Sequence, residues 1–184
     1  MFIDKLIKEI QNKKSPIVVG LDPRLGKIPQ TIKKPWFEKY GKTPEAAGKS
    51  ILEFNKRIID AVSDIVPAVK PQIAFYEQYG LEGLDAYIRT CKYANQEGLL
   101  VIGDVKRGDI GTTSKAYSNA HLGGVDIGGI LHETFAVDAI TTNPYLGDDC
   151  LKEFATDIQE KAKGMFVLVK TSNPTSSQLQ DLVA

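Results

Sequence analysis

The sequence predicts an α/β fold in which parallel strands alternate with helices. Apolar runs of four or five residues recur along the chain, and such runs are typical of strands buried on both faces of a sheet. Longer segments between them carry apolar residues at three- and four-residue steps, as one helix face does. Alternation of this kind favours a parallel sheet. The expected strands cover residues 17–21, 66–69, 99–102, 137–141 and 165–169.

Helices are expected before the first strand and between the later ones. Thr43 can cap a helix whose first position is Pro44, where the missing proline N–H costs nothing. Gly98 is suited to the left-handed conformation that ends many helices. The expected helices cover residues 2–10, 44–62, 77–96, 112–121 and 148–161, with another in the tail 175–184.

Two segments are predicted to be loops. Residues 23–42 contain three prolines, several lysines and Trp36, and we interpret them as a long loop after the first strand. The glycine-rich stretch 123–129 does not follow an expected strand, which favours a loop or helix breaker over a phosphate-binding turn. No break in composition divides the chain, so residues 1–184 are predicted to be a single domain.

Composition excludes several classes of function. The 184 residues include 23 acidic and 23 basic side chains, so nothing in the net charge favours nucleic acid or an anionic membrane as a partner. No apolar run approaches the length of a membrane span, and the amino terminus lacks the apolar core of a secretory signal. Two cysteines indicate a reducing compartment, and we expect a cytoplasmic protein. Two histidines make a histidine-rich metal centre improbable, and no metal is expected.

Polar side chains gather where the expected strands end. Because the carboxyl ends of parallel strands meet at one rim, these residues are expected to form a ligand site there. Taken one at a time, an aspartate after a strand is more often a turn or cap residue. The residues concerned are Asp22, Lys70, Asp104, Lys106, Asp109, Asn143, Ser172 and Asn173.

The densest group lies in residues 104–111. Side chains alternate along a strand, so Asp104 and Lys106 are expected on one face, partly withdrawn from water. Gly108 and Gly111 allow a sharp turn that would return Asp109 to the pair. Adjacent carboxylates would keep Lys106 protonated, which favours a cationic acid beside a developing carbanion over a Schiff base. The alternative is a salt bridge that merely closes the strand end, although such a buried cluster is a poor choice for stability alone.

Five motifs in this order resemble the orotidine 5′-phosphate decarboxylase family, most closely its longer-chain bacterial subgroup. They are GLDP at 20–23, VKPQIAFYE at 69–77, GDVKRGDIG at 103–111, TNPYLG at 142–147 and VKTSNP at 169–174. The resemblance implies a (β/α)₈ TIM barrel and a homodimer with shared active sites. It also implies cofactor-free decarboxylation of orotidine 5′-monophosphate to UMP and CO₂ in pyrimidine biosynthesis, without metal.

The resemblance also implies roles for individual residues. Lys106 would donate the proton to C6 of the pyrimidine, and Asp104 would lie near the departing carboxylate, linked to Lys70. Asp22 and Lys70 would bind the ribose. Asp109, Ile110 and Thr113 would enter from the other subunit, Ser172 would bond the pyrimidine amide, and Asn173 and Asn143 would line the pocket.

Length leaves alternatives open, because 184 residues fall well short of the roughly 250 of a typical (β/α)₈ barrel. We expect about the first five β/α units of such a barrel, truncated after the fifth strand, without counterparts of the family's phosphate-binding glutamine and arginine. One alternative is a magnesium-dependent sugar-phosphate decarboxylase or synthase of the same superfamily. Others are an inactive barrel fragment and a flavodoxin-like binding module of five parallel strands.

Overall fold

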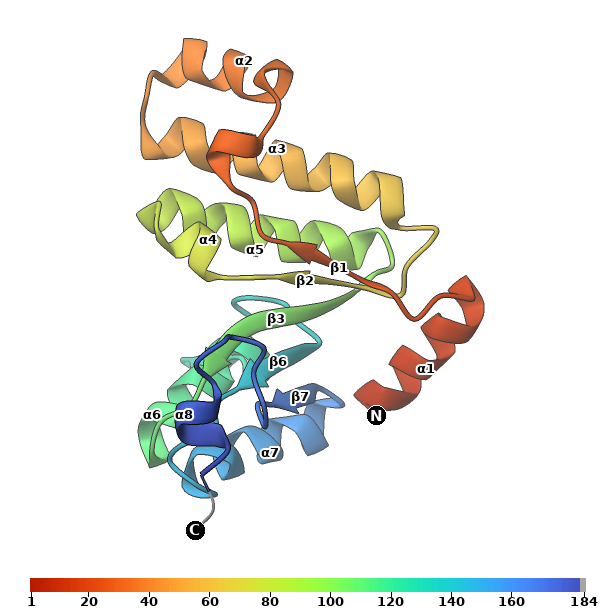
Figure 1. The fold of residues 1–184 in the computed structure, drawn as a ribbon, viewed down its shortest axis with the longest axis vertical. Coiled ribbons are helices and arrows are strands. Elements are labelled where there is room, and N and C mark those ends of the chain that lie inside the picture. The colour runs from red at the N-terminus through yellow and green to blue at the C-terminus, as the bar shows by residue number, and fades with distance from the viewer. Residues whose placement is uncertain (183–184) are drawn as a thin grey trace.

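A computed structural model describes residues 1–182 and contains one five-stranded parallel sheet with helices against it (Figure 1). The strand order is β1-β2-β3-β6-β7, so each strand lies beside the next main strand along the chain. This arrangement confirms the predicted α/β class and all five expected strands. The strands are β1 Val18–Leu21, β2 Ala68–Pro71, β3 Leu100–Arg107, β6 Ala139–Thr142 and β7 Gly164–Val167.

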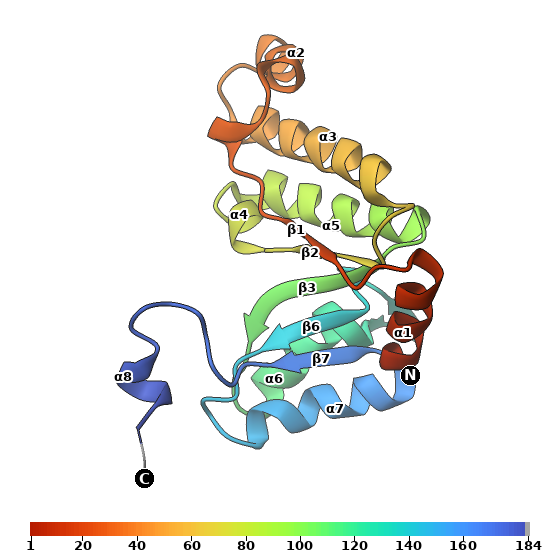
Figure 2. The ribbon, with the colours of Figure 1, turned by 45° about the vertical axis from the view of Figure 1, so that its right-hand side comes forward.

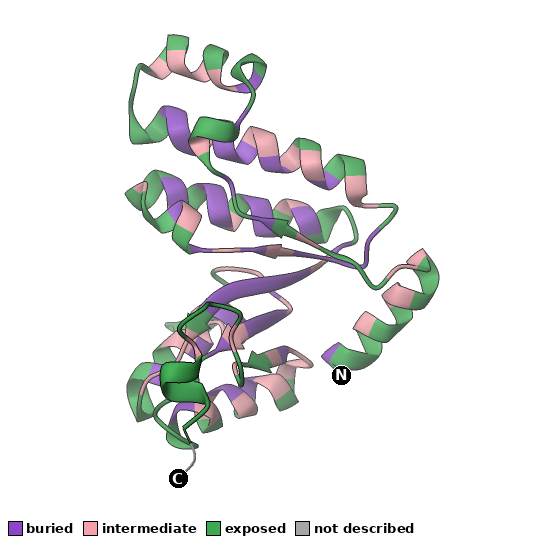
Figure 3. Ribbon diagram, in the orientation of Figure 1, coloured by how far each residue is buried: buried purple, intermediate pink, exposed green. Residues whose placement is uncertain are grey.

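Helices supply the large hydrophobic core on one side of the sheet. The buried faces of α3 and α5 contribute Ile51, Ile59 and Tyr87 to this core, which also contains Val69 and Val101 of the sheet (Figure 3). None of the helices in the described part of the chain has both the length and the apolar character that crossing a membrane requires. The helices are α1 Phe2–Lys13, α2 Gln30–Tyr40, α3 Pro44–Val62, α4 Ala74–Glu77, α5 Gly80–Gln96, α6 Gly111–Ser118, α7 Asp149–Lys161 and α8 Ser177–Gln180, with the short turns η1 Leu25–Lys27 and η2 Asn119–Gly123.

The other face of the sheet carries a much smaller apolar cluster. Phe2 of α1 packs there with Ala68, Ile102 and Ala139, one from each of three neighbouring strands. Helix α1 lies near the strands' amino ends, apart from α3 and α5 (Figure 2). The sheet therefore has one face filled by apolar side chains and a second face with an apolar floor only at its amino-terminal end.

The prediction of a long loop over 23–42 was wrong, because this segment forms η1 and then the eleven-residue helix α2. Pro29 lies at the N-cap of α2, where a proline does not interrupt hydrogen bonding, and only Pro35 lies inside the helix. Ile32 is buried, and α2 packs on α3. Tertiary packing thus outweighs the composition that favoured a loop.

Smaller differences concern glycines. The helix expected over 77–96 begins three residues later: Glu77 is the last residue of α4, and Gly80, which has a φ of 65°, is the first residue of α5. The stretch 123–129 does break a helix, but it continues into the hairpin of β4 Val125–Ile127 and β5 Ile130–His132. Both turn glycines, Gly128 and Gly129, have positive φ, as this kind of tight hairpin requires. Helix α8 forms part of the helix expected over 175–184. Residues 183 and 184 of that expected helix lie outside the described part of the chain.

We predict that Gly83→Ala strongly destabilises the protein. A Cβ on Gly83 would lie 1.9 Å from the backbone oxygen of Tyr76, so α4 and α5 could not keep their separation. Overpacking of this kind typically costs about 1–3 kcal/mol in the free energy of unfolding. Gly26→Ala is the control, since nothing lies within 4 Å of its Cβ position. Urea unfolding measures both, and equal stability of the two variants would contradict the packing argument.

Candidate active site

The face of the sheet that carries the small apolar cluster also carries the site. On β3, Val101 and Val105 belong to the core under the helices, whereas Leu100 and Ile102 face the other way. Asp104 continues the row begun by Leu100 and Ile102, because side chains alternate along a strand. Lys70 stands two residues after Ala68 on β2, and is placed on the same face by the same alternation. The polar residues therefore lie directly beyond the apolar floor.

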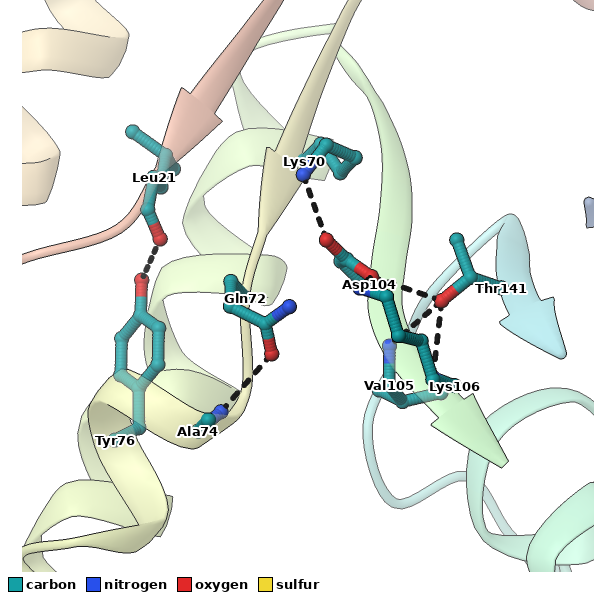
Figure 4. Close-up of polar contacts among 9 residues, drawn as sticks. All are labelled: Leu21, Lys70, Gln72, Ala74, Tyr76, Asp104, Val105, Lys106 and Thr141. Atoms are coloured by element: carbon teal, nitrogen blue, oxygen red, sulfur yellow. Dashed lines mark hydrogen bonds and ion pairs between the residues drawn. The ribbon is translucent and has the colours of Figure 1, made fainter. Parts of the chain in front are cut away.

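Two lysines hold one carboxylate at the centre of this face (Figure 4). Lys70 Nζ donates to Asp104 Oδ2 at 2.8 Å, and Lys106 Nζ donates to Asp104 Oδ1 at 2.5 Å. The predicted pairing of Asp104 with Lys106 is therefore present in the structure, and Lys70 joins it from the neighbouring strand. These three residues form what we call the Lys–Asp–Lys cluster.

The carboxylate of the cluster is more buried than its cations. The Asp104 side chain is 10% exposed, against 34% for Lys70 and 46% for Lys106. Burial raises the pKa of the Asp104 carboxyl, but hydrogen bonds from Lys106, Lys70 and Thr141 outweigh it, so the pKa lies below its ordinary value of 3.8. Asp104 is therefore ionised at neutral pH. With two ammonium groups for one carboxylate, the cluster can attract an anion and can present a proton at Lys106.

Thr141 is the site residue that the sequence analysis missed. Its hydroxyl lies against the bulged part of β3 and contacts Asp104, Val105 and Lys106 at 2.9–3.0 Å. The sequence carried only a weak signal for this residue. Strand alternation places Thr141 on the same face as Ala139 and the cluster, but it places every second residue of the strand there too. Only the pairing of β6 with β3 brings this hydroxyl to the cluster.

A buried hydrogen-bond network joins the carboxyl end of β1 to α3 and α4. Tyr76 OH donates to the carbonyl oxygen of Leu21 at 3.2 Å, as Figure 4 shows, and Asn55 Nδ2 donates to Tyr76 OH at 2.9 Å. Both side chains are fully buried. Because Leu21 directly precedes Asp22, this network fixes where the chain leaves β1.

The turn after β3 was expected to return Asp109 to the pair, but within the described residues Asp109 makes no ion pair with the cluster lysines. Its Oδ1 accepts from the N–H of Ile110 at 2.8 Å, and its own N–H donates to Ser114 Oγ at 3.1 Å. Both ion pairs of the cluster lysines within the described residues are with Asp104. Ile110 and Thr113 lie beside it at the start of α6 and are exposed. The block 109–113 is thus turned toward the surface of this chain.

The remaining predicted site residues lie at the rim without joining the cluster. Asp22 is exposed and borders a cavity of about 240 Å³ with Arg24 and Lys27. Asn143 Oδ1 accepts from the N–H of Tyr145. Ser172 and Asn173 are exposed in the segment after β7 that leads away from the sheet (Figure 2). Among the described residues, no group of three or more histidine, cysteine or acidic side chains is arranged to hold a metal ion.

A parallel sheet whose five strands lie in chain order, with a lysine–carboxylate cluster near the strand ends, has the architecture of part of a (β/α)₈ barrel, a class in which such ends carry the active site. Comparison with known proteins specifies the family. Residues 15–184 match the profile of the Orotidine 5'-phosphate decarboxylase / HUMPS family, and the chain belongs to this family.

Relatives and solved structures agree with this assignment. An orotidine 5'-phosphate decarboxylase of Caldicellulosiruptor saccharolyticus is 43% identical over 181 residues, covering 98% of this chain and 59% of the relative. One from Clostridium novyi is 42% identical, covering 98% and 56%. The structure of Leishmania donovani OMP decarboxylase superimposes with a TM-score of 0.74 at 33% identity, covering 100% of this chain and 59% of that one. The chain thus spans about six tenths of the length of these relatives.

We predict that Asp104 contributes to the pH dependence of stability. Its pKa is lower in the folded state than in the unfolded state, so its contribution is present above the ordinary carboxyl value and is lost as the pH falls through the lowered value. Asp104→Asn removes this contribution. Urea unfolding between pH 2.5 and 6 should therefore show a shallower acid loss of stability in Asp104→Asn than in the wild type.

Asp64→Asn is the control for this measurement. Asp64 is exposed and has no ion pair within residues 1–182, so its replacement should leave the acid slope unchanged. An acid slope of Asp104→Asn equal to that of the wild type would show that the cluster does not hold its carboxylate ionised.

Proposed function

We propose that this chain carries the catalytic cluster of an orotidine 5′-phosphate decarboxylase, which converts orotidine 5′-monophosphate to UMP and CO₂ in pyrimidine biosynthesis. The observation that carries the proposal is the Lys–Asp–Lys cluster beside the strand ends of a chain whose relatives are named for this activity. Such a cluster provides a fixed cation at the place where negative charge must develop.

The proposed reaction needs one proton and no redox partner. The bond between C6 of the pyrimidine and its carboxyl carbon breaks, CO₂ leaves, and the bonding electron pair stays on C6. The Lys106 ammonium stabilises this pair and then donates a proton to it, so that UMP carries hydrogen at C6. Preorganised charge in a water-poor site is commonly the largest catalytic contribution. Asp104 holds the ammonium in place and lies near the departing carboxylate.

Other residues have proposed roles in binding. Lys70 and Asp22 would contact the ribose, with Lys70 also holding the far oxygen of Asp104. In a homodimer with shared sites, Asp109, Ile110 and Thr113 would enter the pocket of the neighbouring subunit. The exposure of Ile110 and Thr113 in this chain supports that role, since Ile110 is 61% exposed despite its apolar side chain.

The segments after β6 and β7 would complete the pocket. Ser172 would hydrogen-bond the pyrimidine amide, and Asn173 and Asn143 would line the pocket. We expect the reaction to need no cofactor and no metal, and the enzyme to act in the cytoplasm as a single-domain protein. The names of the relatives favour this activity over a magnesium-dependent synthase of the same family.

We predict that Lys106→Ala abolishes decarboxylation while some binding of the nucleotide remains. Loss of a general acid typically costs about 10²–10⁴-fold, and Lys106 would also supply the stabilising charge, so we expect a decrease at the upper end of that range or beyond. The measurement is the ultraviolet absorbance change on loss of orotidine 5′-monophosphate, with and without a chelator. Lys92→Ala, an exposed lysine on α5, is the control.

Each outcome of this assay decides between functions. Turnover that survives chelation and is lost in Lys106→Ala supports the proposal. Near-normal turnover in Lys106→Ala would overturn the assignment of the acid. Turnover lost on chelation would contradict the metal-free mechanism, and absence of turnover in the unmodified chain would favour the alternatives, an inactive fragment or a magnesium-dependent enzyme with a sugar-phosphate substrate.

A further inference from the structure

The backbone of β3 is irregular at the point where it carries the cluster. Its register with β6 pairs Gly103 with Ile140 and resumes at Arg107 with Thr142, leaving three residues opposite one. Lys106 has a φ of 45°, in the left-handed region that side chains other than glycine rarely adopt. This conformation costs about 1–2 kcal/mol, so neighbouring contacts must hold it.

Thr141 fills the gap in the strand pairing. Its Oγ1 accepts the N–H of Val105 at 3.0 Å and the N–H of Lys106 at 2.9 Å, so one hydroxyl receives two consecutive backbone groups. The third contact of the same oxygen, at 2.9 Å, is with Asp104 Oδ1 (Figure 4). The hydroxyl therefore takes the acceptor role that backbone carbonyls have in a regular ladder.

The directions of these three hydrogen bonds are fixed by chemistry. A backbone N–H can only donate, so Thr141 must accept from both Val105 and Lys106 and uses its two lone pairs for them. Its one hydroxyl proton is then left for the Asp104 carboxylate. One side chain thus fixes both the backbone that carries Lys106 and the carboxylate oxygen that receives the Lys106 ammonium.

We propose that Thr141 is the positioning residue that sets the proton donor against the carboxylate. It acts through Lys106 and Asp104, and its catalytic consequence rests on the decarboxylation proposed above. The hydroxyl stabilises the left-handed backbone conformation of Lys106. It also holds the Asp104 carboxylate in one orientation. Without it, the ammonium would no longer have a single position relative to the strand.

The neighbouring threonine provides a matched control. Thr142 is fully buried one residue further along the same strand, and its hydroxyl has no hydrogen-bond partner among the described residues. Thr141→Val and Thr142→Val therefore make the same chemical change at adjacent positions. Only the first removes hydrogen bonds to the cluster. Thr141→Ser retains the hydroxyl and is the conservative variant.

We predict that Thr141→Val shifts the titration of Asp104 upward. The measurement is the carbon-13 shift of the Asp104 carboxyl against pH in protein labelled at aspartate, with Asp104→Asn providing the assignment. Thr142→Val should titrate as the wild type, and Thr141→Ser should return to it. An unchanged Asp104 titration in Thr141→Val would overturn the proposal, whether or not the chain decarboxylates its substrate.

Turnover provides the second readout. We expect Thr141→Val to lower kcat by about tenfold to a hundredfold with a small change in KM, because misplacement of a catalytic group by an ångström has effects of this size. Thr141→Ser should recover most of kcat. If Asp104 titrates as predicted but the wild type shows no turnover, the positioning stands and the proposed decarboxylation fails. Equal kcat in Thr141→Val and wild type would overturn the role of Thr141 in catalysis.

If the Thr141→Val variant does not fold, a measurement on the wild type still tests the proposal. The amide protons of Val105 and Lys106 should exchange slowly with solvent, although Lys106 lies in an exposed part of the strand. Rapid exchange of both amides would show that the hydroxyl does not hold the bulge, and would overturn the proposal.

Discussion

The interaction on which the rest of the site depends is the double salt bridge to Asp104. A carboxylate that is 10% exposed is stable as an anion only if cations and hydrogen bonds replace the water it has lost. Lys70 comes from the adjacent strand and Lys106 from the same strand, so both strands must keep their separation and register. The fold supplies this through the parallel pairing of β2 with β3 and the core beneath them.

One face of the sheet carries the main hydrophobic core, and the other face carries the polar cluster. The face under α3 and α5 buries large apolar side chains between these helices and the strands. The opposite face has only the small cluster around Phe2, which requires a glycine at 164 because a Cβ there would lie 2.3 Å from the Phe2 ring. Polar side chains can therefore occupy the rest of that face without interrupting the main core. The desolvation of Asp104, which its hydrogen bonds and ion pairs outweigh, is thus confined to a face that the main core does not use.

Much of this arrangement follows from local sequence pattern, and the remainder depends on contacts distant in the chain. Apolar runs predicted every main strand, and alternation placed Asp104 and Lys106 on one face. Helix α2 could not be predicted, because its prolines are typical of loops and its stability comes from packing on α3. Asp109 was expected beside the pair, but its backbone is hydrogen-bonded to Ser114, five residues later, and the ion pairs of the cluster lysines among the described residues are with Asp104. Thr141 was missed because its role exists only where β6 lies against a bulge in β3.

The charge balance of the cluster links binding to the proposed chemistry. Two ammonium groups are paired with one carboxylate, so the cluster has a net positive charge. The Lys106 side chain is the more exposed of the two lysines, so this charge is accessible at Lys106. A substrate carboxylate placed there would be attracted by Lys106 and repelled by Asp104. Loss of CO₂ removes the repelled group and leaves the electron pair beside the attracting one. Under the proposed reaction, the same three side chains therefore favour the transition state over the bound substrate, which is the requirement for an increase in kcat.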